Sequence, residues 1–199
     1  MAEKIFFTSD QHYGHANVLK FCNRPYTSVE EMTEGLIEKH NSVVKSGDLV
    51  YNLGDMFWRT LTVDQCVAIR LRLNGNHYYI NGNHEERMQN SEMKRYFVYR
   101  KDYDRIHPKG YPHIVLMHYC LRTWEGSHRG DWSLYGHSHG GLSPAVQGLT
   151  KEESPFSMDV GVDTHEMFPY SLEEVAERMQ KIKDSYQGVE VANTFPREG

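Results

Sequence analysis

Residues 4–12, KIFFTSDQH, join a strand-forming run to a pair of polar side chains. Lys4–Ser9 is rich in β-branched and aromatic residues, which predicts a first β-strand. Asp10 and His12 follow it two positions apart, so an extended backbone turns both side chains to one face. The sequence therefore predicts a strand that ends in a carboxylate and an imidazole able to bind one metal ion together.

Further stretches repeat this arrangement of a predicted strand followed by a polar cluster. The predicted strands are Leu49–Leu53, His77–Ile80, Tyr111–Met117 and Asp131–Tyr135. The clusters that follow them are Gly54-Asp55, Gly82-Asn83-His84-Glu85, His118 and Gly136-His137-Ser138-His139. Because ligands of open α/β sheets bind beyond the carboxyl ends of the strands, we expect all these clusters to meet at one edge.

Helices are predicted between and after the strands. Capping-box spacing occurs in three pairs: Ser28 with Glu31, Thr62 with Gln65, and Ser171 with Glu174. The side chains expected on the inner faces are Val29, Met32, Leu36, Ile37 and His40 of the first helix, Val63, Val67 and Leu71 of the second, and Leu172, Val175, Ala176, Met179 and Ile182 of the last. A hairpin is expected around Pro108-Lys109-Gly110, and a further strand over Phe156–Val162. Alternating strands and helices, followed by a strand-rich second half, predict two packed sheets with helices outside.

The composition fits one soluble domain. The chain has 199 residues, of which 39% are hydrophobic and 25% charged, and no apolar run approaches the roughly 18 residues of a membrane span. We expect no signal peptide, and the three scattered cysteines favour a reducing, cytoplasmic setting. The net charge of −5 argues against an extended nucleic-acid groove and favours a small phosphoester substrate.

The clusters offer a mixed set of nitrogen and oxygen donors. Asp55 follows a glycine that lets the backbone turn sharply, and its two oxygens could bridge two cations. A neutral amide oxygen and three imidazoles complete the set, from Asn83, His118, His137 and His139. Such a set suits manganese, iron, zinc, cobalt or nickel better than calcium or magnesium. Two such ions about 3.5–4 Å apart can clamp a phosphoryl group and ionise a bridging water.

The tetrad Asn-Gly-Asn-His occurs twice, at 74–77 and at 81–84. The first precedes a predicted strand and the second follows it, so the strand places them at opposite ends. Only the second tetrad can join the other clusters. We expect the first to form a tight loop after a helix, with Gly75 as the helix stop.

Together the clusters resemble, in order and over residues 10–139, the motifs of the calcineurin-like metallophosphoesterase superfamily. The strings Thr8–His15 (TSDQHYGH) and His118–Trp124 (HYCLRTW) are similar to small single-domain members from bacteria and phages. The resemblance implies an α/β fold, a four-layer αββα sandwich of two mixed β-sheets flanked by helices. It implies that one metal binds Asp10, His12, Asp55 and His139, and that a second binds Asp55, Asn83, His118 and His137. It also implies that His84 is the acid that protonates the leaving oxygen.

Several residues beside the clusters are candidate substrate contacts with a plain structural alternative. These are His15, Arg59, Arg122, Trp124 and His128. Arginine suits bidentate phosphate contacts and tryptophan could stack on a ring, but each could also serve only loop packing or solvation. Glu85 could orient His84 or cap a following helix. Asp159, Asp163 and His165 lie outside the family motifs, and hydrogen bonding at a strand end is the better interpretation.

These observations predict a dinuclear metal-dependent phosphoesterase in which a metal-bridging hydroxide attacks phosphorus. We expect a phosphodiesterase acting on a small nucleotide-type substrate, with manganese favoured; a phosphomonoesterase, including a protein phosphatase, is the alternative. A nuclease and a non-catalytic scaffold are weaker hypotheses, because the chain is acidic and every ligand position is filled. Residues 1–184 are predicted to form the phosphoesterase domain and residues 185–199 a polar tail, while the oligomeric state stays open.

Overall fold

A computed structural model describes residues 3–142 and 155–186. Its first sheet has the strand order β4-β3-β2-β1-β9. The strands are β1 (Ile5–Thr8), β2 (Leu49–Asn52), β3 (Asn76–Ile80), β4 (Arg100–Lys101) and β9 (Tyr170–Ser171). β1 to β4 pair in parallel, and β9 joins β1 in the antiparallel sense. The predicted parallel pairing of the first half is confirmed.

The second sheet has the order β5-β6-β7-β8. Its strands are β5 (Tyr103–Ile106), β6 (Ile114–Met117), β7 (Trp132–Tyr135) and β8 (Ser157–Asp159). β5 and β6 form the predicted hairpin, with Ile106 opposite Ile114, while β6, β7 and β8 are parallel. The strand expected over Phe156–Val162 is shorter, because the chain leaves β8 and enters a 3₁₀ turn, η3 (Val162–Thr164).

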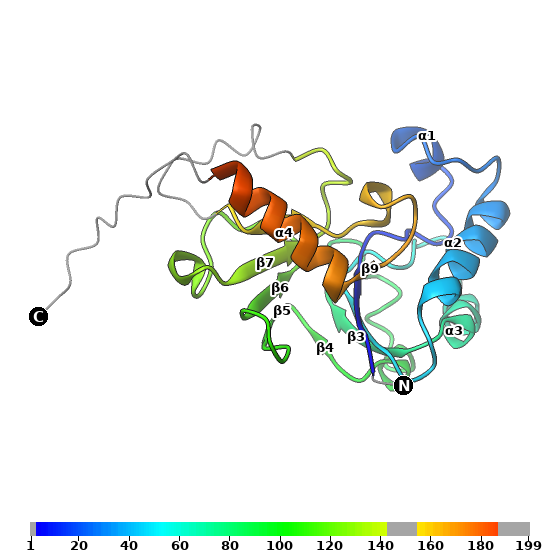
Figure 1. Cartoon of the computed structure of the whole chain (residues 1–199). Helices are drawn as coiled ribbons and strands as arrows, with labels where there is room; N and C mark the ends of the chain where they lie inside the picture. Colours follow the sequence, from blue (N-terminus) through cyan, green and yellow to red (C-terminus); the bar gives the residue numbers. More distant parts are fainter. Residues whose placement is uncertain (1–2, 143–154, 187–199) are drawn as a thin grey trace, which may run out of the picture.

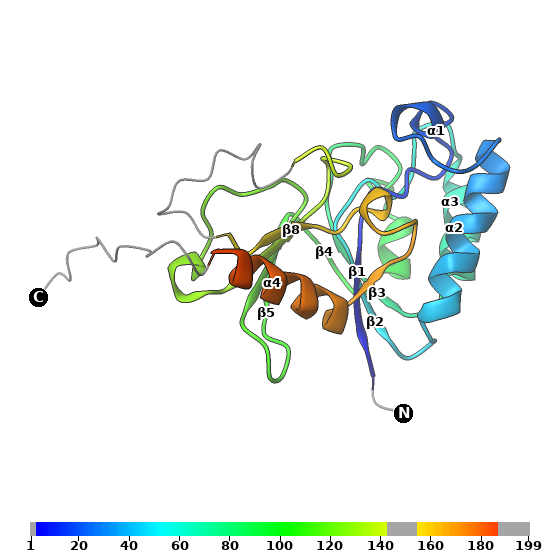
Figure 2. The ribbon, with the colours of Figure 1, turned by 45° about the horizontal axis from the view of Figure 1, so that its top comes forward.

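Four α-helices, α1 (Val18–Phe21), α2 (Val29–Val43), α3 (Val63–Arg72) and α4 (Leu172–Tyr186), and two further 3₁₀ turns, η1 (Met93–Tyr96) and η2 (Ser127–Arg129), complete the described fold. Figures 1 and 2 show α2 and α3 side by side at one end of the molecule, the second sheet toward the other end, and α4 running from β9 across the front of the second sheet. The confirmed architecture is an α/β sandwich of two mixed sheets with helices.

Local signals explain where the helices begin and which faces they bury. Thr62 and Gln65 form a complete capping box at the start of α3. On α2 the predicted inner residues are buried except Val29, which is half-buried. The prediction for Leu71 on α3 is wrong: it is 67% exposed, because α3 turns Cys66 and Ile69 inward instead.

The two larger clusters of the hydrophobic core lie between the helices and the first sheet and between the two sheets. α4 contributes Leu172, Val175 and Met179 to the second cluster, as its spacing predicts. α4 extends two residues past the predicted domain end at 184, and the rest of the predicted tail lies outside the described residues. Among the helices of the described ranges, none has both the length and the apolar character needed to cross a bilayer.

Candidate metal centre

The polar clusters lie together where the parallel strands of both sheets end. Backbone hydrogen bonds continue past the strands and tie the clusters to one another, with Asp10 N donating to Gly54 O at 3.0 Å and Gly136 N to His118 O at 2.9 Å. A bridge between Ser9 and Gly161 links the end of β1 to the segment after β8. The expected meeting of strand ends therefore occurs across two sheets rather than along one.

Glycines allow the loops to approach this closely. A methyl group at Gly82 would lie 2.2 Å from Asp55 Oδ1, and one at Gly136 would lie 2.0 Å from Ser9 Oγ. Real side chains cannot occupy such positions without displacing the neighbouring loop. The glycines that introduce the clusters are therefore required by the contact between the clusters.

Asp10, His12 and His139 form one group of donor atoms that lie within 4.8 Å of one another. Asp10 Oδ1 is 3.9 Å from the Nε2 atoms of both histidines. His139 Nδ1 donates to Asp163 Oδ2 at 2.6 Å. In a neutral His139 ring the lone pair is therefore on Nε2, the nitrogen that faces Asp10. The other carboxylate oxygen, Asp10 Oδ2, accepts from Ser9 Oγ and from His137 N.

Asp55, His118 and His137 form a second group with the same spacing. His118 Nδ1 donates to Leu53 O at 2.7 Å, because a carbonyl oxygen can only accept. The lone pair of a neutral His118 ring therefore lies on Nε2, which is 3.5 Å from Asp55 Oδ2 and 3.0 Å from Asn83 Oδ1. Asn83 thus adds a fourth donor beside this group.

Asp55 lies between the two groups. Its Oδ2 is 3.7 Å from His12 Nε2 of the first group and 3.5 Å from His118 Nε2 of the second. Its Oδ1 accepts a hydrogen bond from His84 N at 2.8 Å. The His84 ring lies on the side of His12, with ring centroids 5.7 Å apart.

The donor set fits divalent metal ions. Asp10 Oδ1 is buried without a hydrogen-bond partner, which is costly for a carboxylate oxygen. Neighbouring donors lie 3.5–3.9 Å apart, too far for hydrogen bonds but within the span of two ligands that each lie about 2.0–2.2 Å from one ion. His118 Nε2 and Asn83 Oδ1 are both acceptors when the ring is neutral, and a shared cation would reconcile their close approach.

The protein environment sets the charges of these groups. Burial raises the pKa of Asp10 to about 6 and lowers the pKa of His12 to about 3. Burial alone would raise the pKa of Asp55, but the close approach of His118 and the hydrogen bond from His84 N lower it to about 2. At neutral pH Asp10 and Asp55 are thus carboxylates and His12 a neutral imidazole, which are the forms that bind metals.

Strained backbone is concentrated in the same residues. Asp10, His12, Asp55, His137 and His139 all have positive φ, between 46° and 67°. Non-glycine residues avoid this region unless their surroundings enforce it, and such residues gather at functional sites. The surrounding contacts therefore hold these residues in unfavourable backbone conformations, and these conformations set the directions of the donor side chains.

The Glu85 side chain contacts the backbone of two neighbouring loops. Its buried Oε1 accepts hydrogen bonds from Gly82 N at 2.7 Å, Tyr79 Oη at 2.8 Å and Asp55 N at 3.2 Å. Glu85 thus ties the loop after β2 to the loop after β3. Its position next to His84 in the tetrad gave no indication of this contact.

The structure brings two candidate substrate contacts to the centre through a residue that the sequence did not single out, Trp58. The Trp58 ring stacks on His15 at 3.7 Å and lies 4.6 Å from the His84 ring. The guanidinium of Arg59 is 5.5 Å from the centre of the same ring. Burial lowers the pKa of His15 to about 4, so at neutral pH this ring is an uncharged hydrogen-bonding group.

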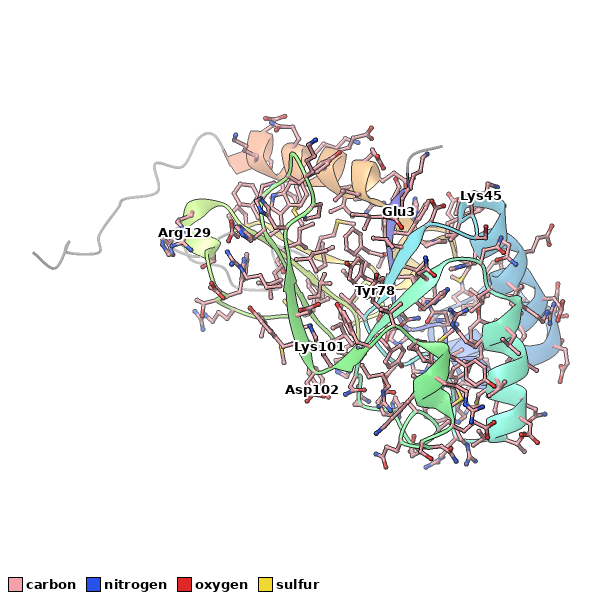
Figure 3. The ribbon with its side chains drawn as sticks, turned by 90° about the horizontal axis from the view of Figure 1, so that it is seen from below. Glu3, Lys45, Tyr78, Lys101, Asp102 and Arg129 are labelled. Carbon is pink, nitrogen blue, oxygen red and sulfur yellow. The ribbon has the colours of Figure 1, made fainter. Side chains whose placement is uncertain are left out.

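The other candidate substrate contacts lie on the loops after β6. Trp124 is buried and its Nε1 donates to Asp131 O at 2.9 Å, which matches the loop packing given as the structural alternative for this ring. Arg122 is exposed. His128 is exposed on η2, 3.3 Å from the Arg129 guanidinium, and Figure 3 shows Arg129 at the end of the molecule away from α2 and α3.

The first copy of the repeated tetrad lies at the other end of the sheet. His77 is part of β3, opposite Val50 near the start of β2, and its Nε2 donates to Asn74 O at 3.0 Å. Gly75 has a φ of 96° and turns the chain between α3 and β3. The prediction that strand β3 separates the two tetrads is confirmed.

Three comparisons place this chain among known proteins. A family model described as calcineurin-like phosphoesterase matches residues 3–118. An uncharacterized protein of Methanocaldococcus jannaschii is 30% identical over 180 residues, which cover 90% of this chain and 93% of the relative. The crystal structure of a protein of unknown function from Aquifex aeolicus matches with a TM-score of 0.70 and 22% identity, over 89% of this chain and 100% of the other. The last comparison supports the fold alone.

Proposed function

Because the chain belongs to the calcineurin-like phosphoesterase family, whose members hydrolyse phosphoesters with divalent metal ions, we propose that it is a dinuclear phosphodiesterase acting on a small nucleotide-type substrate. The observation that carries the dinuclear part is the position of Asp55 Oδ2, 3.7 Å from His12 Nε2 and 3.5 Å from His118 Nε2. One oxygen that faces both donor groups supports a bridging carboxylate.

The two donor groups would each hold one ion. Asp10, His12 and His139 would bind one, Asn83, His118 and His137 would bind the other, and Asp55 would be shared. When bound, the ions would supply the positive charge that acidifies a water molecule and offsets the charge growing on the phosphoryl oxygens. We favour manganese because the donors are a mixture of imidazoles, carboxylates and an amide.

We assign His84 as the group that gives a proton to the leaving oxygen. Its backbone N–H donates to Asp55 Oδ1, which fixes the loop beside both donor groups. Its ring is half-buried and lies against Trp58, so the ring is held while its edge can reach a substrate. His15 and Arg59, which border the same tryptophan, would contact the phosphoester. Residues 1–184 would form the phosphoesterase domain.

The preference for a diester comes from the acidic net charge of −5 and the short chain, which do not favour a polyanion or a dianionic monoester. The test compares bis-p-nitrophenyl phosphate with p-nitrophenyl phosphate under manganese. We expect a higher kcat/KM for the diester. A strong preference for the monoester would replace the proposal with a phosphomonoesterase.

The roles of Asp55 and His84 separate in two variants. Asp55→Asn should lose bound metal or nearly all turnover, whereas His84→Ala should keep its metal and lose about 10²–10⁴-fold in kcat on esters with poor leaving groups. With p-nitrophenolate, which leaves without protonation, the loss in His84→Ala should be much smaller. His107→Ala is a matched control, since this exposed histidine follows β5 at the far end of β6 from His118. An equal loss for good and poor leaving groups would count against the acid role.

A further inference from the structure

Arg24 is a fully buried cation for which the phosphoesterase chemistry gives no role so far. It lies between α1 and α2, and its side chain has 0% exposure. A buried guanidinium is costly unless every donor is paired. Its contacts therefore indicate what the fold gains by burying it.

The guanidinium connects segments that are far apart in the chain. Nε and Nη2 donate to the two oxygens of Asp163 at 2.8 and 2.7 Å, a bidentate pair. Nη1 donates to Gln11 O and Nη2 to Asp10 O, both at 2.7 Å. Arg24 thus holds η3 with one edge and the backbone of the first cluster with the other.

Both ends of this connection lead to one donor group. Asp163 Oδ2 also accepts from His139 Nδ1 at 2.6 Å, which keeps the lone pair on Nε2, facing Asp10. The carbonyls that Arg24 holds belong to Asp10 and its neighbour, and Asp10 has a strained φ of 60°. The second group has its own support, since His118 Nδ1 donates to Leu53 O.

We propose that Arg24 and Asp163 are positioning residues for one of the two metal ions, the one held by Asp10, His12 and His139. Arg24 orients the Asp163 carboxylate, whose Oδ2 accepts from His139 Nδ1, and it holds the Asp10 backbone in its strained conformation. The inference rests on the proposed function, because it takes these side chains to be metal ligands.

A purely structural pair would act differently. If Arg24 and Asp163 only anchored η3 to the rest of the protein, their loss would lower stability and weaken both ions together. If the pair positions ligands, its loss weakens the binding of one ion and leaves the binding of the other unchanged. The experiment therefore measures the two ions separately, by calorimetric titration of the full-length metal-free protein with Mn²⁺ and by electron paramagnetic resonance of the loaded protein.

The variants are Asp163→Ala and Arg24→Lys, with Asp163→Asn as a milder change if either fails to fold. Lysine keeps the charge but cannot make the bidentate pair and both carbonyl contacts. Arg105→Gln is the control, since it removes another ion pair, Arg105 with Asp131 at 2.7 Å, away from the ligands. His139→Ala marks which ion is lost.

We expect the wild type and Arg105→Gln to bind two Mn²⁺ ions that give a spin-coupled spectrum. Asp163→Ala and Arg24→Lys should bind one ion as tightly as the wild type and the other about 10–100-fold more weakly. Below saturation they should show the hyperfine pattern of an isolated ion, as His139→Ala does. Wild-type affinity for both ions in a folded variant, or an equal loss of both, would overturn the inference. Failure of the wild type to bind any ion would overturn the proposed function itself.

Discussion

Replacing Glu85 with alanine should destabilise the protein although Glu85 is not a predicted ligand. The change removes the acceptor of three hydrogen bonds, from Gly82 N, Tyr79 Oη and Asp55 N, at a side chain that is 8% exposed. A buried donor left without a partner costs about 1–3 kcal/mol. Part of this cost is offset because burial also destabilises the charged carboxylate in the wild type, as the raised pKa of Glu85 indicates. We expect a net loss of about 3 kcal/mol, a large share of the roughly 5–15 kcal/mol that stabilises a typical domain.

Urea unfolding of the metal-free protein at pH 7 measures this loss. Glu86→Ala is the control, because the neighbouring glutamate is exposed and its removal should change the free energy of unfolding by less than about 0.5 kcal/mol. Glu85→Gln, which keeps one acceptor oxygen, should fall between the two. If Glu85→Ala matched Glu86→Ala within error, the hydrogen bonds from Asp55, Gly82 and Tyr79 would not be what holds the two loops together.

Three further predictions concern other parts of the molecule. His77→Ala should keep both metal ions despite losing stability, and a metal-depleted variant on elemental analysis would mean that the wrong tetrad had been assigned. Trp58→Leu should keep its metal but lower kcat at least about tenfold, because the variant lacks the ring that packs on His15 and His84. Unchanged turnover would show that this ring does not position the catalytic residues. Burial lowers the pKa of His40 from 6.5 to about 4, so the unfolded chain takes up this proton first as the pH falls. The free energy of unfolding of the metal-free protein should therefore fall by about 2 kcal/mol between pH 7 and pH 5 because of this residue. Urea unfolding at the two pH values should show a smaller fall for His40→Gln. An equal fall in the variant and the wild type would contradict this prediction.

The strands and helix starts were predictable because their signals are local. The run Lys4–Ser9 contains β1, and the pair Thr62 and Gln65 caps α3 as its spacing indicates. Leu71 was misplaced because the rotation of α3 about its axis depends on what it packs against, and the structure turns Cys66 and Ile69 inward instead. The burial of Trp124 was not predictable for the same kind of reason: whether an aromatic side chain on a loop is exposed depends on the segments that cover it.

The sequence by itself determined which donor atoms are available and that they follow successive strands, because residue chemistry and strand periodicity act over a few positions. Only the tertiary structure decided how the donors divide into two groups, that Asp55 lies between them, and that five of the seven ligand candidates have positive φ. It also decided the supporting contacts, such as that of Arg24 with Asp163, which are 139 positions apart. Such contacts leave no local pattern, because they exist only once two sheets and a buried cation have brought distant segments within hydrogen-bonding distance.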